Sequence, residues 1–305
     1  MAESGEQERL IAEIRQLKQK QRAVILAHNY QLPEIYEVAD FIGDSLELAQ
    51  AAARVESALI VFCGVRFMAE NAKLVNPGRP VVLADPKAGC QMANMITAEA
   101  LRRRRQELGD VLVVAYVNTP AEVKAEADIC CTSANAVRVV QSLPRSPKIL
   151  FVPDRNLARW VEQETGREII PWEGFCYVHA QFTVEDVRRA RIEHPGALVV
   201  VHPECPLEVI QVADRVASTS GMVRIAREVK ELVLGTEAGM CNRIRREYPD
   251  CHCYPLRRTA ICRNMKLTSL DDVKAALQGV VPEVEIPAIV AERAQRALKR
   301  MLEIS

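Results

Sequence analysis

The sequence has no excess of charge of either sign. Its 305 residues include 40 Lys+Arg and 40 Asp+Glu, so the formal net charge at pH 7 is zero. A nucleic-acid-binding protein normally carries clustered positive charge, which is missing here. The basic run at 102–105 lies in a helical pattern with Glu99 and Glu107 and is interpreted as a solvated helix face. The composition therefore favours a small molecule or a protein as binding partner, not nucleic acid.

Long apolar runs are absent as well. No run approaches the ~20 apolar residues needed to span a bilayer, and residues 1–21 lack the apolar core of a secretory signal. No Walker loop, GxGxxG or HExxH motif occurs. These absences predict a cytoplasmic protein with no membrane partner. In a reducing compartment, its ten cysteines are expected to be ligands, catalytic groups or buried thiols rather than disulfides.

Three of the cysteines recur at a constant interval. Cys90, Cys176 and Cys262 are each 86 residues apart, and each is followed seven residues later by a segment typical of a helix start. Apolar segments that end in polar residues share the same period. This indicates one supersecondary unit used three times. Three copies around a pseudo-threefold axis would bring three thiols to one point.

Short apolar runs alternate with amphipathic segments in all three repeats, as is typical of parallel sheets covered by helices. We expect an α/β fold of three pseudo-threefold-related α/β/α three-layer sandwich domains, each with a four-stranded parallel sheet, around a central cavity. The expected strands lie near 23–28, 38–43, 58–63 and 80–84, near 111–116, 128–131, 148–152 and 167–171, and near 197–202, 213–217, 231–235 and 252–256.

The period divides the chain into three domains and a tail. The domains are expected at 1–96, 97–182 and 183–265. The tail, 266–305, contains no cysteine and no closing strand, and it ends in a long amphipathic helical segment. We expect it to pack back on the first domain, which otherwise lacks a neighbour at its outer face.

The three periodic thiols have no fourth partner nearby in the sequence. Three thiolates favour a [4Fe–4S] cluster with one open iron, and an open iron is a Lewis acid that can polarise a substrate oxygen. A structural zinc would need a fourth ligand, and open catalytic zinc sites use His and carboxylate more often than three Cys. The alternative interpretation is three buried thiols at equivalent core positions.

The other cysteines break the period. Cys251 or Cys253 could replace Cys262 as a ligand, but Cys253 is interpreted as the start of the last strand. The remaining five occur in apolar or strand-end contexts and are expected to be buried: Cys63, Cys130, Cys131, Cys205 and Cys241.

Polar side chains follow the first strand of each repeat. They are His28 and Tyr30, Tyr116 and Asn118, and His202 and Glu204. Ligands of open parallel sheets bind outside the carboxyl ends of the strands, so we expect these side chains to line one cavity. Tyr30 could move a proton at a carbon or oxygen centre, and His179, three residues after Cys176, would lie beside the metal site.

A hydroxyl residue stands at a later helix start in each repeat: Ser45, Ser133, and Ser218 with Thr219. Such a hydroxyl can cap its helix, or it can bind a phosphate or carboxylate together with the helix N-terminus. The sequence leaves both roles open. Three such ends around one cavity would suit a ligand with several negative groups.

With these residues in view, the chain resembles the quinolinate synthase family of NAD biosynthesis over nearly its whole length. The motifs that carry the resemblance include HNYQ (28–31), GDSLELA (43–49), CGVRFMAE (63–70), YVN (116–118), TSAN (132–135), PDRNL (153–157), WEGFCYVH (172–179), HPEC (202–205), STSGM (218–222), GTEAGM (235–240) and CRNMKLT (262–268). The resemblance implies a [4Fe–4S] cluster on Cys90, Cys176 and Cys262. It also implies a transferase that condenses iminoaspartate with dihydroxyacetone phosphate to quinolinate, phosphate and two waters.

The resemblance further implies catalytic roles for Tyr30, His179 and Glu204. Other cavity residues would hold phosphate or carboxylates: His28, Ser45, Tyr116, Asn118, Ser133, His202, Ser218 and Thr219. The open iron would bind a substrate oxygen and assist loss of hydroxide. An aspartate-oxidising enzyme that supplies iminoaspartate is implied as a functional partner.

Three other hypotheses fit parts of the pattern. The reductase that makes isopentenyl diphosphate and the radical enzymes of diphthamide synthesis are also three-lobed cluster proteins, but they need electron delivery or S-adenosylmethionine. An iron or oxygen sensor predicts a partner surface or a DNA footprint, which the neutral charge does not support. A metal-free repeat scaffold predicts no iron in protein purified without air.

Overall fold

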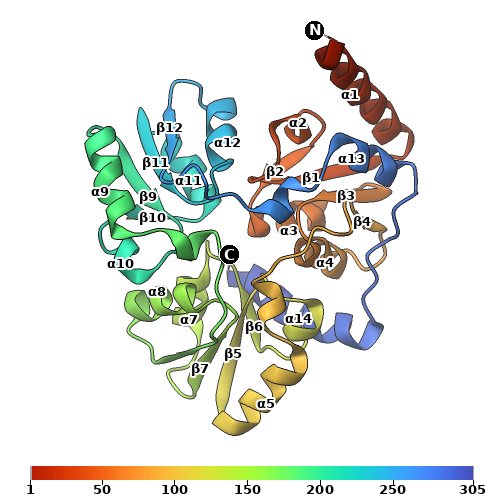
Figure 1. Cartoon of the computed structure of the whole chain (residues 1–305). Helices are drawn as coiled ribbons and strands as arrows, with labels where there is room; N and C mark the ends of the chain where they lie inside the picture. Colours follow the sequence, from red (N-terminus) through yellow and green to blue (C-terminus); the bar gives the residue numbers. More distant parts are fainter. Residues whose placement is uncertain (1, 305) are drawn as a thin grey trace. The chain divides into compact units, whose positions relative to one another are not determined.

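The chain contains three four-stranded sheets in which every strand pairing is parallel. The computed structural model describes residues 2–304. The strand orders are β2-β1-β3-β4, β6-β5-β7-β8 and β10-β9-β11-β12, so one order recurs three times. The chain divides into two compact units: unit 1 is Met1–Cys90 with Cys262–Pro287, and unit 2 is Gln91–Ile261 with Ala288–Ser305. Figure 1 shows the elements of both units.

Unit 1 is a three-layer sandwich around the first sheet. Helices α1 and α13 pack against one face of the sheet, and α3 and α4 against the other. Its elements are α1 (Ala2–Lys20), β1 (Ala23–His28), α2 (Pro33–Tyr36), β2 (Phe41–Gly43), α3 (Ser45–Arg54), β3 (Leu59–Cys63), α4 (Arg66–Val75), β4 (Val81–Leu83), the 3-10 helix η3 (Arg263–Lys266) and α13 (Leu270–Leu277).

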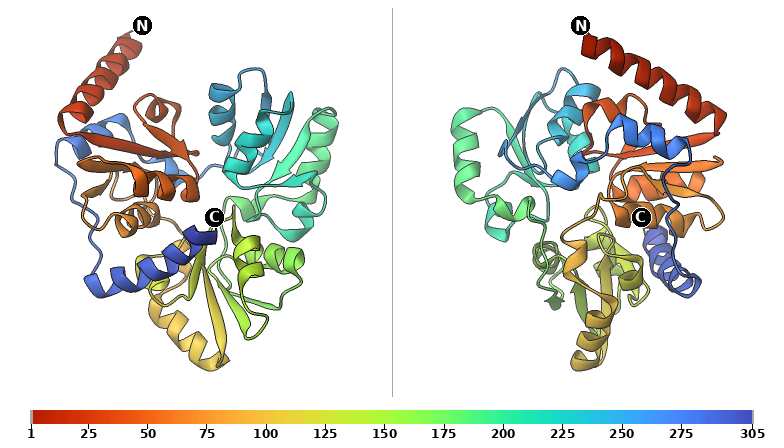
Figure 2. Two further views of the ribbon diagram at one scale, coloured as in Figure 1. Left: turned by 180° about the vertical axis from the view of Figure 1, so that it is seen from behind. Right: turned by 45° about the vertical axis from the view of Figure 1, so that its right-hand side comes forward.

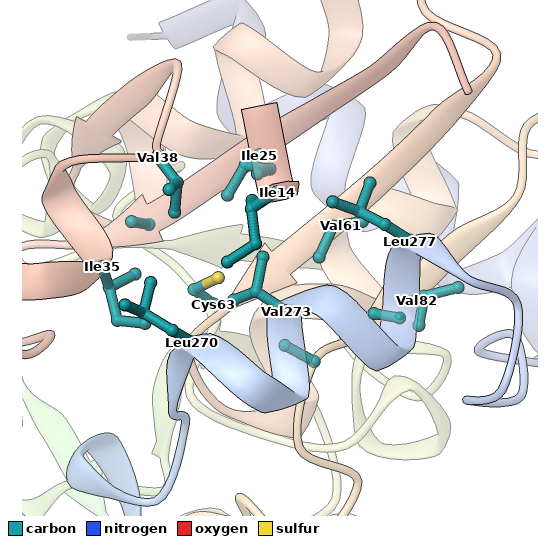
Figure 3. Packing of buried hydrophobic residues seen from close by; sticks show 13 residues of the cluster. Ile14, Ile25, Ile35, Val38, Val61, Cys63, Val82, Leu270, Val273 and Leu277 are labelled. Carbon is teal, nitrogen blue, oxygen red and sulfur yellow. The ribbon is translucent and has the colours of Figure 1, made fainter. Parts of the chain in front are cut away.

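The core of unit 1 joins the beginning of the chain to its C-terminal part, as Figure 3 shows. Ile25 of β1 and Val61 of β3 are register partners in neighbouring strands, so their side chains point to the same face of the sheet. They pack against Ile14 of α1 and Val273 of α13, and all four side chains are fully buried. Apolar burial therefore holds α13 against the first sheet.

Unit 2 contains the second and third sheets with their helices. Its elements are η1 (Ala93–Met95), α5 (Ala98–Leu108), β5 (Val111–Tyr116), α6 (Ala121–Lys124), β6 (Ile129–Cys131), α7 (Ala136–Ser142), β7 (Lys148–Val152), α8 (Arg155–Thr165), β8 (Ile169–Pro171), η2 (His179–Gln181), α9 (Val184–Glu193), β9 (Leu198–Val201), α10 (Leu207–Ile210), β10 (Arg215–Val216), α11 (Thr219–Ala226), β11 (Glu231–Gly235), α12 (Met240–Glu247), β12 (His252–Pro255) and α14 (Ala288–Ile304).

The tail differs from the sequence-based expectation in its last helix. Helix α13 packs on α1 of unit 1, but α14 packs on α6 and β6 of unit 2 (Figure 2). The buried side chains of α14 recur at helical spacing, Ala294, Ala297, Leu298 and Met301, and form one apolar stripe. Arg293 adds an ion pair with Glu126 at 3.1 Å. The sequence pattern predicted this helix but not the surface that it covers.

One side-chain contact is repeated in all three sheets. An aspartate just before the second strand accepts a hydrogen bond from a backbone N–H of the first strand, at 2.7 to 2.8 Å: Asp40 from Ile25, Asp128 from Val113 and Asp214 from Val199. Each aspartate also pairs with a basic side chain of the helix before the sheet, Lys18, Arg105 or Arg191. The contact joins three elements of each repeat in the same way.

The predicted fold class and strands are confirmed, with strand ends within about three residues of those expected. The predicted helix starts are N-caps in the structure: Thr97, Thr183 and Ser269 each accept a backbone N–H through the side chain. Within the described chain, the search for a helix long and apolar enough to cross a membrane finds none.

Candidate functional site

Glu204 is the centre of a buried polar network in unit 2. Its Oε1 accepts a 2.5 Å hydrogen bond from the hydroxyl of Tyr116, at the end of β5. Its Oε2 lies 2.7 Å from Nδ1 of His179, at the start of η2. Three segments that are far apart in the sequence therefore meet at one carboxylate, which is only 3% exposed.

The network sets the protonation of its members. Burial alone would raise the pKa of Glu204, but His179, His202 and the hydrogen bond from Tyr116 lower it to about 2. Burial raises the pKa of Tyr116 well above its ordinary value, and the neighbouring Glu204 raises it further. At neutral pH, Glu204 is therefore a carboxylate and Tyr116 a neutral hydroxyl that donates to it.

His179 has a polar neighbour at each ring nitrogen and a stacking partner on one ring face. Its Nε2 lies 2.9 Å from Oγ1 of Thr236, just after β11. Its ring stacks on that of His202, with centroids 4.5 Å apart and an interplanar angle of 24°. Nδ1 of His202 accepts the backbone N–H of Glu204 at 3.3 Å. A proton on Nδ1 of His179 would face the carboxylate of Glu204, 2.7 Å away.

A second buried carboxyl group lies beside this network. Asp154 follows β7 and starts α8 by accepting the backbone N–H groups of Asn156 and Leu157, each at 2.8 Å. Burial, and then the charge of Glu204, raise the pKa of Asp154 well above its ordinary value. The side chain of Asn156 donates to the backbone carbonyl of Glu204 at 3.0 Å. The start of α8 therefore supports the segment that carries Glu204.

One group of side chains in unit 2 has the composition of a metal site. One ligand atom from each of Cys176, His179 and Glu204 lies within 4.8 Å of the others. Two of the three ligands already share a short contact, at 2.7 Å between His179 and Glu204. An ion bound by all three would compete with that contact, whereas an ion or cluster bound through the Cys176 thiol alone would leave it intact.

Unit 1 repeats part of this arrangement. His28 ends β1, and its Nδ1 accepts the backbone N–H of Tyr30 at 3.2 Å, as His202 accepts that of Glu204. The rings of His28 and Tyr30 meet edge to face, with centroids 4.6 Å apart. The ammonium group of Lys266 donates to the backbone carbonyl of Tyr30. Both side chains at this strand end are buried.

The two periodic cysteines of unit 1 lie in joined segments. Nδ2 of Asn264, two residues after Cys262, donates to the backbone carbonyl of Gly89 at 2.7 Å. Gly89 immediately precedes Cys90. This hydrogen bond links η3, which precedes α13, to the loop that leaves β4.

The ten cysteines differ in burial. Cys90, Cys176 and Cys262, the three at the 86-residue interval, are half-buried, and the other seven are buried. The five predicted to be buried are therefore confirmed as buried, and Cys253 lies in β12, as the interpretation of the last strand requires. Burial raises the pKa of six of these seven thiols: Cys63, Cys130, Cys131, Cys205, Cys251 and, together with its hydrogen bond to Cys241, Cys253. A buried neutral thiol is a poor metal ligand.

Only one of the hydroxyl residues acts as a helix cap. Ser218 caps α11 by accepting the backbone N–H of Gly221 at 3.2 Å, and Thr219 is the buried first residue of that helix. Helix α3 is capped by Asp44 rather than by Ser45, which follows the cap. Helix α7 begins after Asn135, and Ser133 instead hydrogen-bonds Tyr116. Helix capping is therefore not the role of the Ser45 and Ser133 hydroxyl groups.

Asn118 presents an unused acceptor. Its side chain is half-buried, and its Oδ1 is buried without a hydrogen-bond partner among residues 2–304. A buried acceptor without a partner costs free energy. Such an atom is a candidate ligand contact.

Several residues of these networks were not predicted. They are Asp154, Asn156, Thr236, Asn264 and Lys266. Each lies inside or beside a motif that carries the family resemblance, such as GTEAGM at 235–240. The motifs were therefore the signal that could have identified these residues. Their contacts could not be predicted, because they join positions that are far apart in the sequence.

Parallel sheets with ionisable side chains buried at the carboxyl ends of their strands define an α/β enzyme. The family model for "Quinolinate synthetase A protein" matches residues 12–303, and the chain belongs to this family. It is 49% identical over 297 residues to a quinolinate synthase of Desulforudis audaxviator, covering 97% of this chain and 98% of the relative. It is 51% identical over 294 residues to that of Methanoregula boonei, covering 96% and 97%, and 50% identical over 300 residues to that of Thermococcus onnurineus, covering 98% and 99%.

Proposed function

We propose that the chain catalyses the reaction for which its relatives are named, in the cytoplasm. Iminoaspartate and dihydroxyacetone phosphate would condense to quinolinate, with release of phosphate and two waters. The observation that supports this best is the buried network of Tyr116, Glu204 and His179, since its residues lie in the motifs that the family resemblance identified. An aspartate-oxidising enzyme would supply the unstable imine.

We propose a [4Fe–4S] cluster held by Cys90, Cys176 and Cys262. Thiolates are the usual ligands of such clusters, and these three are the half-buried thiols among ten. The hydrogen bond from Asn264 to Gly89 supports the proposal, because it joins the segments of two of the ligands. When bound, the cluster would supply an open iron that acts as a Lewis acid toward a substrate oxygen.

Glu204 would act by holding charge rather than by moving a proton. With a pKa of about 2, it stays ionised at neutral pH and is a weak base. It would keep the Nδ1 proton of His179 and the hydroxyl proton of Tyr116 in place. The other ring nitrogen of His179, Nε2, would then exchange a proton with the substrate. The substrate would replace the hydroxyl of Thr236 as the partner of this nitrogen.

Tyr30 would be the second proton-transfer group. Its backbone is fixed from both sides, by Nδ1 of His28 and by the ammonium group of Lys266. These two contacts hold the backbone of Tyr30 in place. Its phenol would act as the acid or base in carbon–carbon bond formation and dehydration.

The remaining polar residues would bind the substrates' phosphate and carboxylates. Hydroxyl groups near helix starts, imidazoles and amides suit such anions. The residues proposed for this role are His28, Ser45, Tyr116, Asn118, Ser133, His202, Ser218 and Thr219. The strongest individual support is for Ser45, which leaves capping to Asp44, and for Asn118, whose Oδ1 is buried without a partner among residues 2–304.

The decisive experiment combines iron content and product release, both measured without oxygen. Wild-type protein should hold four irons and release quinolinate from dihydroxyacetone phosphate and freshly generated iminoaspartate. Cys262→Ala should lose the cluster and the activity, whereas Cys251→Ala, a buried thiol outside the period, should keep both. Four-iron wild-type protein that releases no quinolinate would contradict the proposed reaction. Equal iron content in the two variants would contradict the ligand assignment.

A further inference from the structure

Two cysteines that take no part in the proposed cluster lie in direct contact in unit 2. The thiol of Cys253 donates a hydrogen bond to Sγ of Cys241, and the two sulfur atoms are 2.8 Å apart. This is longer than a covalent disulfide of about 2.05 Å but short for two unbonded sulfur atoms. Both side chains are buried, at 1% and 2% exposure.

The two thiols belong to adjacent elements. Cys241 lies in the first turn of α12, and Cys253 is the second residue of β12, which packs on that helix. β12 is an edge strand of the third sheet and pairs with β11. A bond between the sulfur atoms would therefore fasten the edge strand to the helix that covers it.

A surface pocket borders one member of the pair, Cys253. A surface pocket of about 350 Å³ is lined by Cys251, Cys253 and Arg245, together with Pro249, His252 and Tyr254. The guanidinium group of Arg245 donates to the backbone carbonyl of Cys253 at 2.9 Å, so a positive charge stands next to the thiol and favours its thiolate.

We propose that Cys241 and Cys253 form a reversible disulfide that fastens β12 to α12. A small-molecule disulfide, RSSR, would be the oxidant. The thiolate of Cys253 attacks one sulfur atom of RSSR and releases RS⁻, and Cys241 then displaces the second RS⁻ from the mixed disulfide. Two protein thiols lose two protons and two electrons, and RSSR is reduced to two RSH. The proposal is independent of the quinolinate synthase reaction.

The reaction is slow at neutral pH. The hydrogen bond to Cys241 and burial both raise the pKa of Cys253, and the thiolate is the attacking form. The rate of cross-linking should therefore increase from pH 7 to pH 9.

Tryptic peptide mapping tests the proposal on the cluster-loaded full-length protein. Trypsin places Cys241 in peptide 231–243, and Cys251 and Cys253 in peptide 247–257. After anaerobic incubation with bis(2-hydroxyethyl) disulfide and alkylation of the remaining thiols, the two peptides should be joined, and dithiothreitol should separate them. The cross-link should raise the thermal unfolding midpoint by about 5 °C.

Two variants identify the partner and keep the test decisive. Cys253→Ser should abolish the joined peptide, while Cys251→Ser should retain it. Unchanged far-UV circular dichroism and iron content verify that both variants fold. The proposal is overturned if the wild-type peptides remain separate under the oxidant, or if the joined peptide persists in Cys253→Ser.

Discussion

Replacing Glu204 by Gln removes the charge on which the buried network depends while keeping the size of the side chain. Despite its burial, the pKa of Glu204 is lowered from 4.5 to about 2. At about 1.36 kcal/mol per pKa unit, that difference corresponds to roughly 3 kcal/mol of stability at pH 7. A carboxyl group whose pKa is lower in the folded state stabilises the protein above its unfolded pKa. The contribution is lost as the pH falls, and about half remains at pH 3.

Urea unfolding followed by tryptophan fluorescence measures this contribution. Both tryptophans, Trp160 and Trp172, lie in unit 2, so their fluorescence reports on the unit that contains Glu204. At pH 7, Glu204→Gln should lower the free energy of unfolding by roughly 3 kcal/mol, and the loss should shrink between pH 4.5 and pH 3. The matched control is Glu208→Gln, which replaces an exposed carboxyl group four residues later. It should change the free energy of unfolding by less than about 0.5 kcal/mol.

Two results would refute this reasoning. The first is equal stability of the Glu204→Gln and Glu208→Gln variants at pH 7. The second is a loss of stability in Glu204→Gln that stays constant between pH 7 and pH 3, because a loss without pH dependence would come from packing rather than from charge.

Five further variants separate chemistry, binding and stability. Tyr30→Phe should retain iron and lose quinolinate production, because only the phenolic oxygen is removed; wild-type turnover would exclude Tyr30 from the reaction. Ser45→Ala should raise the KM for dihydroxyacetone phosphate about tenfold through one lost hydrogen bond at unchanged stability. Asp44→Ala, which removes the cap of α3, should instead lower the free energy of unfolding by about 1 kcal/mol in a urea titration; a similar loss in Ser45→Ala would contradict this separation. Leu277→Ala in the buried core should cost about 3 kcal/mol by circular dichroism in urea, and Val280→Ala, 73% exposed, serves as its control; equal losses would contradict the assigned core.

The fold could be predicted from the sequence because its signals are local. A buried parallel strand such as 111–116 is a continuous apolar run, and Thr183 with Asp186 forms a capping box within four residues. The apolar stripe of α14 predicted a helix. It did not predict α6 and β6 as the surface that this helix covers, because an apolar stripe does not specify its partner.

The candidate site was predictable in its residue types but not in its contacts. Polar residues at strand ends identified Tyr116 and Glu204, but the 2.5 Å bond between them joins positions 88 residues apart. Thr236 contacts His179 across 57 positions and has no periodic signal of its own. The choice of Asp44 over Ser45 as helix cap depends on a difference of one residue, which sequence patterns do not resolve.

The positions of α13 and α14 set the order in which the chain can finish folding. Because α13 completes the core on one face of the first sheet, and α14 covers β6 and α6, neither unit can bury its apolar surface while only the first 260 residues have been synthesised. Both helices follow residue 260 and therefore leave a ribosome after the strands that they cover. The surface of β6 and α6 is covered by α14 only once residues 288–304 are free, so a nascent chain carries these apolar faces unburied until that stretch has been synthesised.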